Sequence, residues 1–271
     1  MTDNPGVPSN GTSATGSHTG SRTVPQRAAT TARTAVVWNV LRGVLADLGT
    51  EAGGPLEIVD AGGGTGGSAV PLAELGHHVT VVEPSPDSLA ALERRAAEVG
   101  VRVRALQGET GDLADLVPAG HAHLVLVHNV LEYVEDPLAA LRDVVRVTRP
   151  GGAVSLLAAN AVAGILHRSL AGHFEEARRL LESADGRWGP ADPMPRRFTE
   201  RHLTGLAAQA GLTETEVRGV RVFADLLPGR VFEGDPQAGQ ALMELEQAAS
   251  VHPALSGIAT QLHVLARRPA S

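Results

Sequence analysis

The sequence contains no cysteine and no lysine. The absence of cysteine excludes disulfides, thiolate-bound metals and cysteine nucleophiles. All 23 basic residues are therefore arginines, against 30 acidic residues, and the formal net charge is −7. That balance argues against binding of nucleic acid through bulk electrostatics, because neutralising phosphates takes clustered cations. No run of about 18 apolar residues is present, so a membrane-spanning helix is not expected.

With 271 residues and 43% hydrophobic content, the chain has the size and composition of one globular α/β domain. Residues 1–24 are mostly Ser, Thr, Gly, Asn and Pro, which bury too little apolar surface to offset the entropy of ordering. We therefore expect a disordered tail over 1–24 and one domain over 25–271. The start of the chain has neither the basic segment nor the apolar segment of a secretory signal, so we expect a cytoplasmic protein.

Short apolar runs alternate with helical segments from residue 56 onward, which is typical of a mostly parallel, doubly wound, Rossmann-like α/β sheet. The expected strands are 56–61, 78–83, 101–107, 123–128, 153–159, 214–223 and 257–266. The expected helices are 28–48, 67–75, 86–98, 112–116, 137–147, 199–210 and 236–249. Between 160 and about 197 the alternation stops, and helix-like patches with a Pro/Gly-rich loop predict a small helical cap insertion.

The first expected strand runs into the turn Asp60-Ala61-Gly62-Gly63-Gly64-Thr65-Gly66. Glycine permits positive φ and lets a ligand approach the backbone. The same string also fits the G-x-G-x-x-G pattern, so the glycines alone leave both a dinucleotide and S-adenosylmethionine open. The carboxylate of Asp60 would repel a pyrophosphate but suits a ligand with an ammonium and a sulfonium. This position favours S-adenosylmethionine.

Acidic and polar residues follow the next two expected strands. Glu83 ends the second strand, where a carboxylate can accept hydrogen bonds from both ribose hydroxyls of a nucleoside. Glu109, Thr110 and Gly111 follow the third strand, where enzymes that use S-adenosylmethionine place the groups facing adenine; which of the three makes the contact stays open. The last two expected strands resemble the end of the seven-stranded methyltransferase sheet, whose last strand is antiparallel.

Further strings lie at 32–38 (ARTAVVW), 128–133 (HNVLEY), 219–223 (GVRVF), 242–246 (LMELE) and 263–269 (HVLARRP). With the glycine turn they resemble the tRNA 5-carboxymethoxyuridine methyltransferases, which methyl-esterify a modified wobble uridine. The resemblance covers roughly residues 30–269. It implies that Arg33 reaches the cofactor's carboxylate, that Gly62 and Gly63 lie along the cofactor, that Glu83 holds the ribose and that His128 lies near the methyl donor.

Methyl transfer from a sulfonium starts from an activated donor, so the protein supplies alignment and desolvation. A carboxylate acceptor needs no base. We expect His128 to position the acceptor, or to act as a base if the acceptor is a hydroxyl. Guanidinium groups bind carboxylate and phosphate bidentately, so an acceptor site is predicted among Arg168, His173, Arg196, Arg197 and Arg221. No metal site is expected.

Four functions stay open. The resemblance implies methylation of a modified uridine in a tRNA anticodon loop. The same chemistry on a small carboxylic acid or hydroxyl metabolite is the second, a nicotinamide-dependent oxidoreductase is the third, and a catalytically silent sensor of S-adenosylmethionine is the fourth. The stretch between 174 and 195 has no lysine cluster of the kind that suits an RNA-binding cap, which weakens the first.

Overall fold

The computed structural model describes residues 24–227 and 237–270, with side chains from residue 34 onward. All but one residue of the predicted tail therefore lies outside the described residues. The strands are β1 (Glu57–Ala61), β2 (His78–Glu83), β3 (Arg104–Gln107), β4 (Ala122–His128), β5 (Thr148–Ala159), β6 (Thr213–Val220) and β7 (Gln261–Arg267). The α-helices are α1 (Val24–Ala52), α2 (Ala69–Glu74), α3 (Pro86–Glu98), α4 (Leu113–Leu116), α5 (Pro137–Val147), α6 (Ala161–Leu170), α7 (Phe174–Glu182), α8 (Glu200–Gln209) and α9 (Ala238–Ala249).

The seven strands form one sheet in the order β3-β2-β1-β4-β5-β7-β6. β1 pairs in parallel with β2 and β4, β2 with β3, and β4 with β5. β7 lies between β5 and β6 and runs antiparallel to both. The predicted Rossmann-like sheet with an antiparallel last strand is confirmed. The strand order reverses between β1 and β4, and open α/β sheets bind their ligands at such a switch point.

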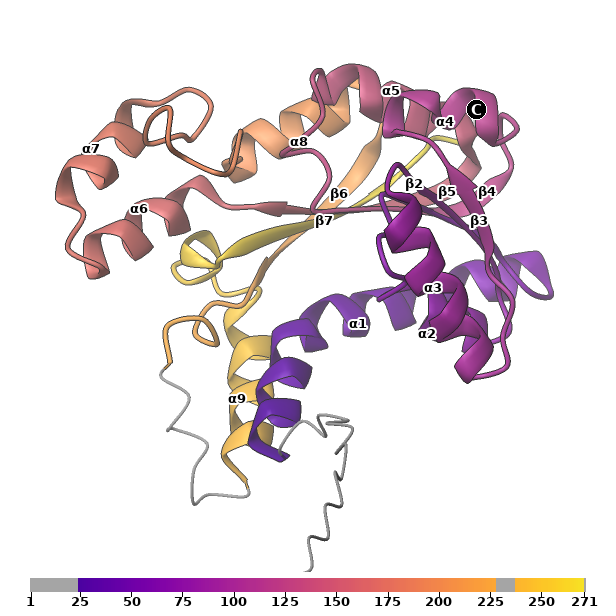
Figure 1. Cartoon of the computed structure of the whole chain (residues 1–271), viewed down its shortest axis with the longest axis horizontal. Helices are drawn as coiled ribbons and strands as arrows, with labels where there is room; N and C mark the ends of the chain where they lie inside the picture. The colour runs from indigo at the N-terminus through magenta and orange to yellow at the C-terminus, as the bar shows by residue number, and fades with distance from the viewer. Residues whose placement is uncertain (1–23, 228–236, 271) are drawn as a thin grey trace, which may run out of the picture.

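Helices cover both faces of the sheet (Figure 1). Leu41 of α1 packs with Leu126 of β4 on one face, which α2 and α3 also cover. Leu141 of α5 and Leu203 of α8 pack with Val125 of β4 on the other face. Neighbouring residues of a strand point to opposite faces, so β4 contributes to both cores and reads as a continuous apolar run. α9 lies against α1 (Figure 1).

α3 and α5 begin and end where the sequence predicted, because each carries its own start signal. A proline occupies the first turn of both helices, where its missing N–H leaves no hydrogen bond unmade. Oγ of Ser85 accepts from the Ser88 amide at 3.2 Å and caps α3. Oδ1 of Asp136 accepts from the Leu138 amide at 2.9 Å and caps α5.

β5 begins at Thr148, earlier than the predicted start at 153. Residues 150–152 lie inside this strand, where Gly151 has a φ of +76°. Its amide donates to the carbonyl of Arg268 at 3.0 Å, and the Arg268 amide donates to the carbonyl of Gly152 at 2.9 Å. The end of the chain thus pairs with this stretch, a contact that no local pattern signals.

α6 and α7 form a helical hairpin beyond the end of the sheet, where the cap insertion was predicted (Figure 1). Asn160 joins it to the domain. Its Oδ1 accepts from the Val162 amide at 3.0 Å and caps α6, while its Nδ2 donates to the carbonyl of Ala259 at 2.8 Å. The hairpin is therefore anchored both to the end of β5 and to the loop before β7. The division into tail, domain and cap remains a prediction.

Candidate active site

The glycine turn follows the carboxyl end of β1. Gly62 has a φ of +73°, and its amide donates to the carbonyl of Val82 at 2.7 Å. A Cβ on Gly62 would lie 2.4 Å from Cγ2 of Val130, so a side chain fits only if Val130 moves. Gly64 also has a positive φ of +54°, but a Cβ there would meet nothing within 4 Å. The turn is closed on the side of Val130 and open at Gly64.

Two carboxyl groups meet at this turn. Asp60 is only 3% exposed, and a Cβ on Gly63 would lie 2.8 Å from its carboxyl carbon. Burial and, second, the charge of Glu83 raise the pKa of Asp60 to about 7. Glu83 accepts from the amide of Gly64 at 3.0 Å and from the amide of Ser85 at 3.1 Å. A cationic ligand here would stabilise the charged forms of both carboxyl groups.

A cleft of about 650 Å³ opens beside the turn, at the carboxyl ends of β1, β2 and β4. Five predicted cofactor residues line it: Gly62, Glu83, Glu109, Thr110 and Gly111. The other predicted residues with described side chains are not in its lining: Asp60, Gly63, Gly64 and His128. The side chain of Arg33 lies outside the described residues. The individual roles of these residues in cofactor binding remain predictions.

The opposite wall of the cleft comes from the segment after β4, whose residues were not predicted as site residues. In the sequence this segment belongs to the string at 128–133, of which we predicted only His128 as a site residue. Tyr133 lines the cleft and is 61% exposed. Asn129 also lines the cleft, has a φ of +58° and bonds through Oδ1 to Nε2 of Gln261. Asn tolerates the left-handed region better than most residues, so it fits this position.

Two side chains hold this segment in place. Oε1 of the buried Glu132 accepts from the amide of Ala159 at 2.6 Å, and burial raises the pKa of the Glu132 carboxyl above its usual range. Nη1 of Arg196 donates to the carbonyls of Leu131 at 3.3 Å and Val134 at 2.9 Å. Arg196, predicted as an acceptor residue, therefore bonds to the wall of the cleft in this structure. Its role toward the acceptor remains a prediction.

His128 ends β4 and is half-buried. Its Nε2 lies 2.8 Å from Oγ of Ser155, which lies 2.7 Å from Nε2 of His263. Burial lowers the pKa of His128 to about 4, so the ring is neutral at pH 7. A neutral ring beside the turn can donate or accept one hydrogen bond without adding charge.

The comparisons with known proteins agree with this geometry. The methyltransferase-domain family matches residues 59–156. The chain is 32% identical over 241 residues to the tRNA 5-carboxymethoxyuridine methyltransferases of Escherichia coli O157:H7 and K12, which covers 88% of this chain and 89% of theirs. The chain belongs to their family, the S-adenosylmethionine-dependent methyltransferases. Its enzyme class and its cofactor, S-adenosylmethionine, follow from that membership.

Other similar proteins act on different acceptors or share only the fold. A ubiquinone biosynthesis O-methyltransferase of Methylobacterium nodulans is 32% identical over 168 residues, covering 61% of this chain and 63% of that protein. The solved structure of an S-adenosylmethionine-dependent methyltransferase from Methanosarcina mazei superposes with a TM-score of 0.53 at 16% identity, covering 80% of this chain and 94% of that one. At that identity the likeness shows the fold alone.

The residues at the turn fit S-adenosylmethionine better than a dinucleotide. Asp60 and Glu83 place two carboxyl groups beside the glycines, and burial together with the charge of Glu83 raises the pKa of Asp60. A ligand bearing a sulfonium and an ammonium relieves that repulsion, whereas a pyrophosphate would add to it. The glycine pattern left both a dinucleotide and S-adenosylmethionine open, and membership of the methyltransferase family decides for S-adenosylmethionine.

A second pocket of the methyltransferase, about 360 Å³, lies between the cap hairpin and the end of β5; we call it the cap pocket. It is lined by three of the predicted acceptor residues: Arg168, His173 and Arg197. Asn160 and Thr260 complete its floor on the side of the sheet. The structure thus brings together two arginines and a histidine that the sequence could place only on one insertion.

The arginines of this region also bind acidic residues of the chain. Nη1 of Arg168 lies 2.9 Å from Oε2 of Glu176, and its Cζ lies 4.5 Å from the ring centroid of Trp188. Arg197 holds Asp192 with Nη1 and Nη2 at 2.6 and 3.1 Å. Burial by itself would raise the pKa of Asp192. The bonds from Arg197 and those from backbone amides nevertheless hold the pKa of Asp192 below its usual range.

Arg221, the remaining predicted acceptor residue, lies outside the cap pocket. Its Nη1 pairs with Oδ2 of Asp225 at 3.3 Å, and its backbone has a φ of +60°. The roles of Arg221 and of the cap-pocket residues toward an acceptor remain predictions.

No helix in the described ranges is both long and apolar enough to cross a membrane. Residues 24–227 and 237–270 contain no group of three His, Asp or Glu side chains that could hold a metal ion.

Proposed function

We propose that the methyltransferase esterifies the carboxylate of a modified uridine in the anticodon loop of tRNA. The relatives that support this proposal match over 89% of their length, far beyond the stretch that matches the methyltransferase-domain family. With 241 of the 271 residues aligned, the match extends beyond the methyltransferase-domain stretch into the cap. Segments added to a shared fold are where we expect the choice of acceptor to be made.

The cap pocket is the observation that carries the proposal. It lies beside Asn160, directly after the carboxyl end of β5, so it shares an edge of the sheet with the glycine turn. Arg168 and His173 line it and supply hydrogen-bond donors for an anion. An acceptor that carries both a carboxylate and phosphates matches these donors.

S-Adenosylmethionine supplies an activated methyl group, which passes to a carboxylate oxygen as the carbon–sulfur bond breaks. The chain's residues then need only to align the carboxylate and exclude water. His128 is neutral and near the turn, so it can hold one oxygen of the acceptor. A carboxylate releases no proton in this step, so the proposed reaction does not need His128 to act as a base.

A small carboxylic acid or hydroxyl metabolite is the second candidate acceptor. Two observations favour it. The ubiquinone biosynthesis O-methyltransferase of Methylobacterium nodulans is 32% identical over 168 residues. Arg168 and Arg197 both pair with carboxylates of the chain itself, which leaves less cationic surface for an RNA backbone.

The test is a nucleoside profile of tRNA from a strain without this gene, complemented with the wild-type gene or with a Glu83→Ala variant. We expect the methyl ester on the wobble uridine to be missing in the deletion strain and restored only by the wild type. Purified enzyme with hypomodified tRNA should then form one ester per tRNA. An unchanged profile, together with turnover of a small acid or hydroxyl compound in vitro, would establish the second candidate instead.

A further inference from the structure

A chain of hydrogen bonds crosses the sheet behind His128. Oγ of Ser155 on β5 lies 2.8 Å from Nε2 of His128 on β4 and 2.7 Å from Nε2 of His263 on β7. Ser155 and His263 are fully buried. Arg218 on β6 is paired in register with His263, so the two side chains leave the sheet on the same face. Four adjacent strands therefore each contribute one polar residue to this row.

Ser155 has a single hydroxyl proton for two imidazole neighbours. It can donate to only one Nε2, and the other ring must donate its own Nε2 proton to the hydroxyl oxygen. Both rings are neutral at pH 7, because burial lowers the pKa of His128 to about 4 and that of His263, with smaller contributions from His128 and Arg218, to about 3. One ring thus carries its proton on Nε2 and the other on Nδ1. Each arrangement contains one Nε2–H ring and one Nδ1–H ring, so the intrinsic preference of imidazole for one tautomer does not distinguish them. The surroundings of the two rings therefore decide which arrangement is more stable.

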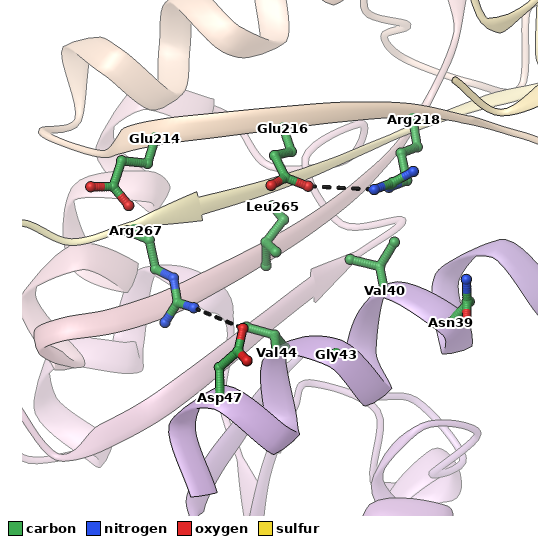
Figure 2. A pocket seen from close by; sticks show the side chains of 10 residues that line it. All are labelled: Asn39, Val40, Gly43, Val44, Asp47, Glu214, Glu216, Arg218, Leu265 and Arg267. Atoms are coloured by element: carbon green, nitrogen blue, oxygen red, sulfur yellow. Dashed lines mark ion pairs between the residues drawn. The ribbon is translucent and has the colours of Figure 1, made fainter. Parts of the chain in front are cut away.

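Arg218 distinguishes the two arrangements. Nδ1 of His263 and Nε of Arg218 are both buried, and neither has a hydrogen-bond partner within the described part of the chain. Figure 2 shows Arg218 on β6 beside a pocket between α1 and β7. Nη2 of Arg218 pairs with Oε2 of Glu216 at 3.5 Å. A proton on Nδ1 of His263 would be a buried donor beside a cation, with no acceptor. A lone pair there is stabilised by the same cation.

We propose that Arg218, His263 and Ser155 fix His128 as the Nδ1–H tautomer, so that the ring presents a hydrogen-bond donor to the methyl acceptor. His263 donates from Nε2 to Ser155, and Ser155 donates to Nε2 of His128. Nδ1 is then the only nitrogen of His128 left for a substrate, and it carries the proton. Arg218, His263 and Ser155 are positioning residues in this scheme.

This tautomer favours one class of acceptor. An Nδ1–H group can hold one oxygen of a carboxylate while the other oxygen attacks the methyl group. It cannot take a proton from a hydroxyl, because its lone pair is already bound by Ser155. The inference rests on the proposed function for the identity of the acceptor, and it favours the carboxylate over the hydroxyl within that proposal.

The tautomer can be read directly by nitrogen NMR of the full chain loaded with S-adenosylhomocysteine and no acceptor. The His128 signals are assigned by their loss in His128→Gln. For His128 we expect the nitrogen chemical shift of a protonated nitrogen at Nδ1 and that of an unprotonated nitrogen at Nε2. In Arg218→Met we expect the ratio of the two tautomers to move by about tenfold or more toward Nε2–H, the effect of losing one charge-assisted interaction. Arg218→Lys should keep the wild-type pattern.

Arg267→Met is the matched control, because Arg267 lines the same pocket and pairs with Asp47 at 3.9 Å but is in register with Thr213 rather than with His263. Its spectrum should equal that of the wild type. A wild-type ring protonated on Nε2 overturns the proposal, and so does an Nδ1–H ring that Arg218→Met leaves unchanged. If Arg218→Met does not fold, the spectrum of Ser155→Ala is recorded instead. A His128 ring that is still wholly Nδ1–H in Ser155→Ala also overturns the proposal.

These outcomes are separate from those of the proposed function, because the spectrum is recorded without an acceptor. Failure to methylate tRNA with the expected spectrum counts against the tRNA proposal alone. Efficient methylation of tRNA by an enzyme whose His128 is protonated on Nε2 contradicts the proposed Nδ1–H tautomer and leaves the proposed function intact.

Discussion

The amide of Gly64 donates to Oε2 of Glu83 at 3.0 Å, which ties the turn after β1 to the end of β2. Oε1 of the same side chain accepts from the amide of Ser85 at 3.1 Å. Each carboxylate oxygen has a second lone pair, so Glu83 can also accept from the hydroxyls of a ribose in the cleft that it lines. One side chain therefore shapes the glycine turn and lines the cleft.

Glu83→Ala should weaken binding of S-adenosylhomocysteine by about 10- to 100-fold, the loss of one or two charge-assisted hydrogen bonds. Isothermal titration calorimetry measures the change. Glu135→Ala is the matched control, because it removes the same charge from the opposite wall of the cleft. We expect its affinity to stay within about threefold of the wild type. Equal losses in both variants would mean that Glu83 acts only through the general charge of the cleft.

Asp60 should make the protein without cofactor less stable as the pH rises. Its pKa is about 7 in the fold, raised by burial and by Glu83, against 3.8 for a free carboxyl group. The folded state therefore holds a proton that the unfolded state has lost between these values, and stability falls as pH rises through the folded pKa. Between about pH 5 and pH 8 the loss is on the order of 2 to 3 kcal/mol.

Asp60→Asn removes this titration. Urea unfolding without cofactor should give similar stabilities for wild type and variant only near pH 4, and a variant that is increasingly the more stable of the two as the pH rises to about 7. The same variant should bind S-adenosylhomocysteine, which carries an ammonium, more weakly. A stability difference that is independent of pH would show that Asp60 is not protonated in the fold.

Gly62→Ala should destabilise the protein without cofactor more than Gly64→Ala. Both residues have positive φ, so both substitutions carry the backbone cost of about 1 kcal/mol. Only the Cβ at Gly62 would also clash, at 2.4 Å from Val130. Adding Val130→Ala should recover part of the loss in the Gly62 variant and none in the Gly64 variant. Thermal unfolding measures all four proteins, and equal losses in the two single variants would exclude the clash.

Local signals were enough to predict much of the fold. Ser85 and Asp136 each precede a proline and an amphipathic segment, and they start α3 and α5 where they were expected. The turn at 60–66 predicted which end of the sheet holds the cofactor, because its glycines and Asp60 are adjacent in the chain. These features depend on residues a few positions apart.

Contacts between distant residues were not predictable in this way. Arg196 reaches the carbonyl of Val134, 62 residues away, and Ser155 reaches His263, 108 residues away. Both contacts depend on how the last third of the chain returns to the sheet, with β7 inserted between β5 and β6. Alternation of strands and helices gives the number of strands, but their order in the sheet is set by packing.

Arg168→Met should raise the KM for the acceptor by about 10- to 100-fold and leave the affinity for S-adenosylhomocysteine unchanged. Arg168 lines the cap pocket, away from the cofactor cleft, and methionine keeps the length of its apolar stem. Arg178→Met is the matched control on the same hairpin, since Arg178 is exposed and pairs with Glu182 at 2.9 Å outside the pocket. Steady-state kinetics with hypomodified tRNA or with a small acid compares the two variants. An equal rise in both would indicate general attraction to the cap, whereas a rise only in Arg168→Met makes the cap pocket the place where the acceptor's anion binds.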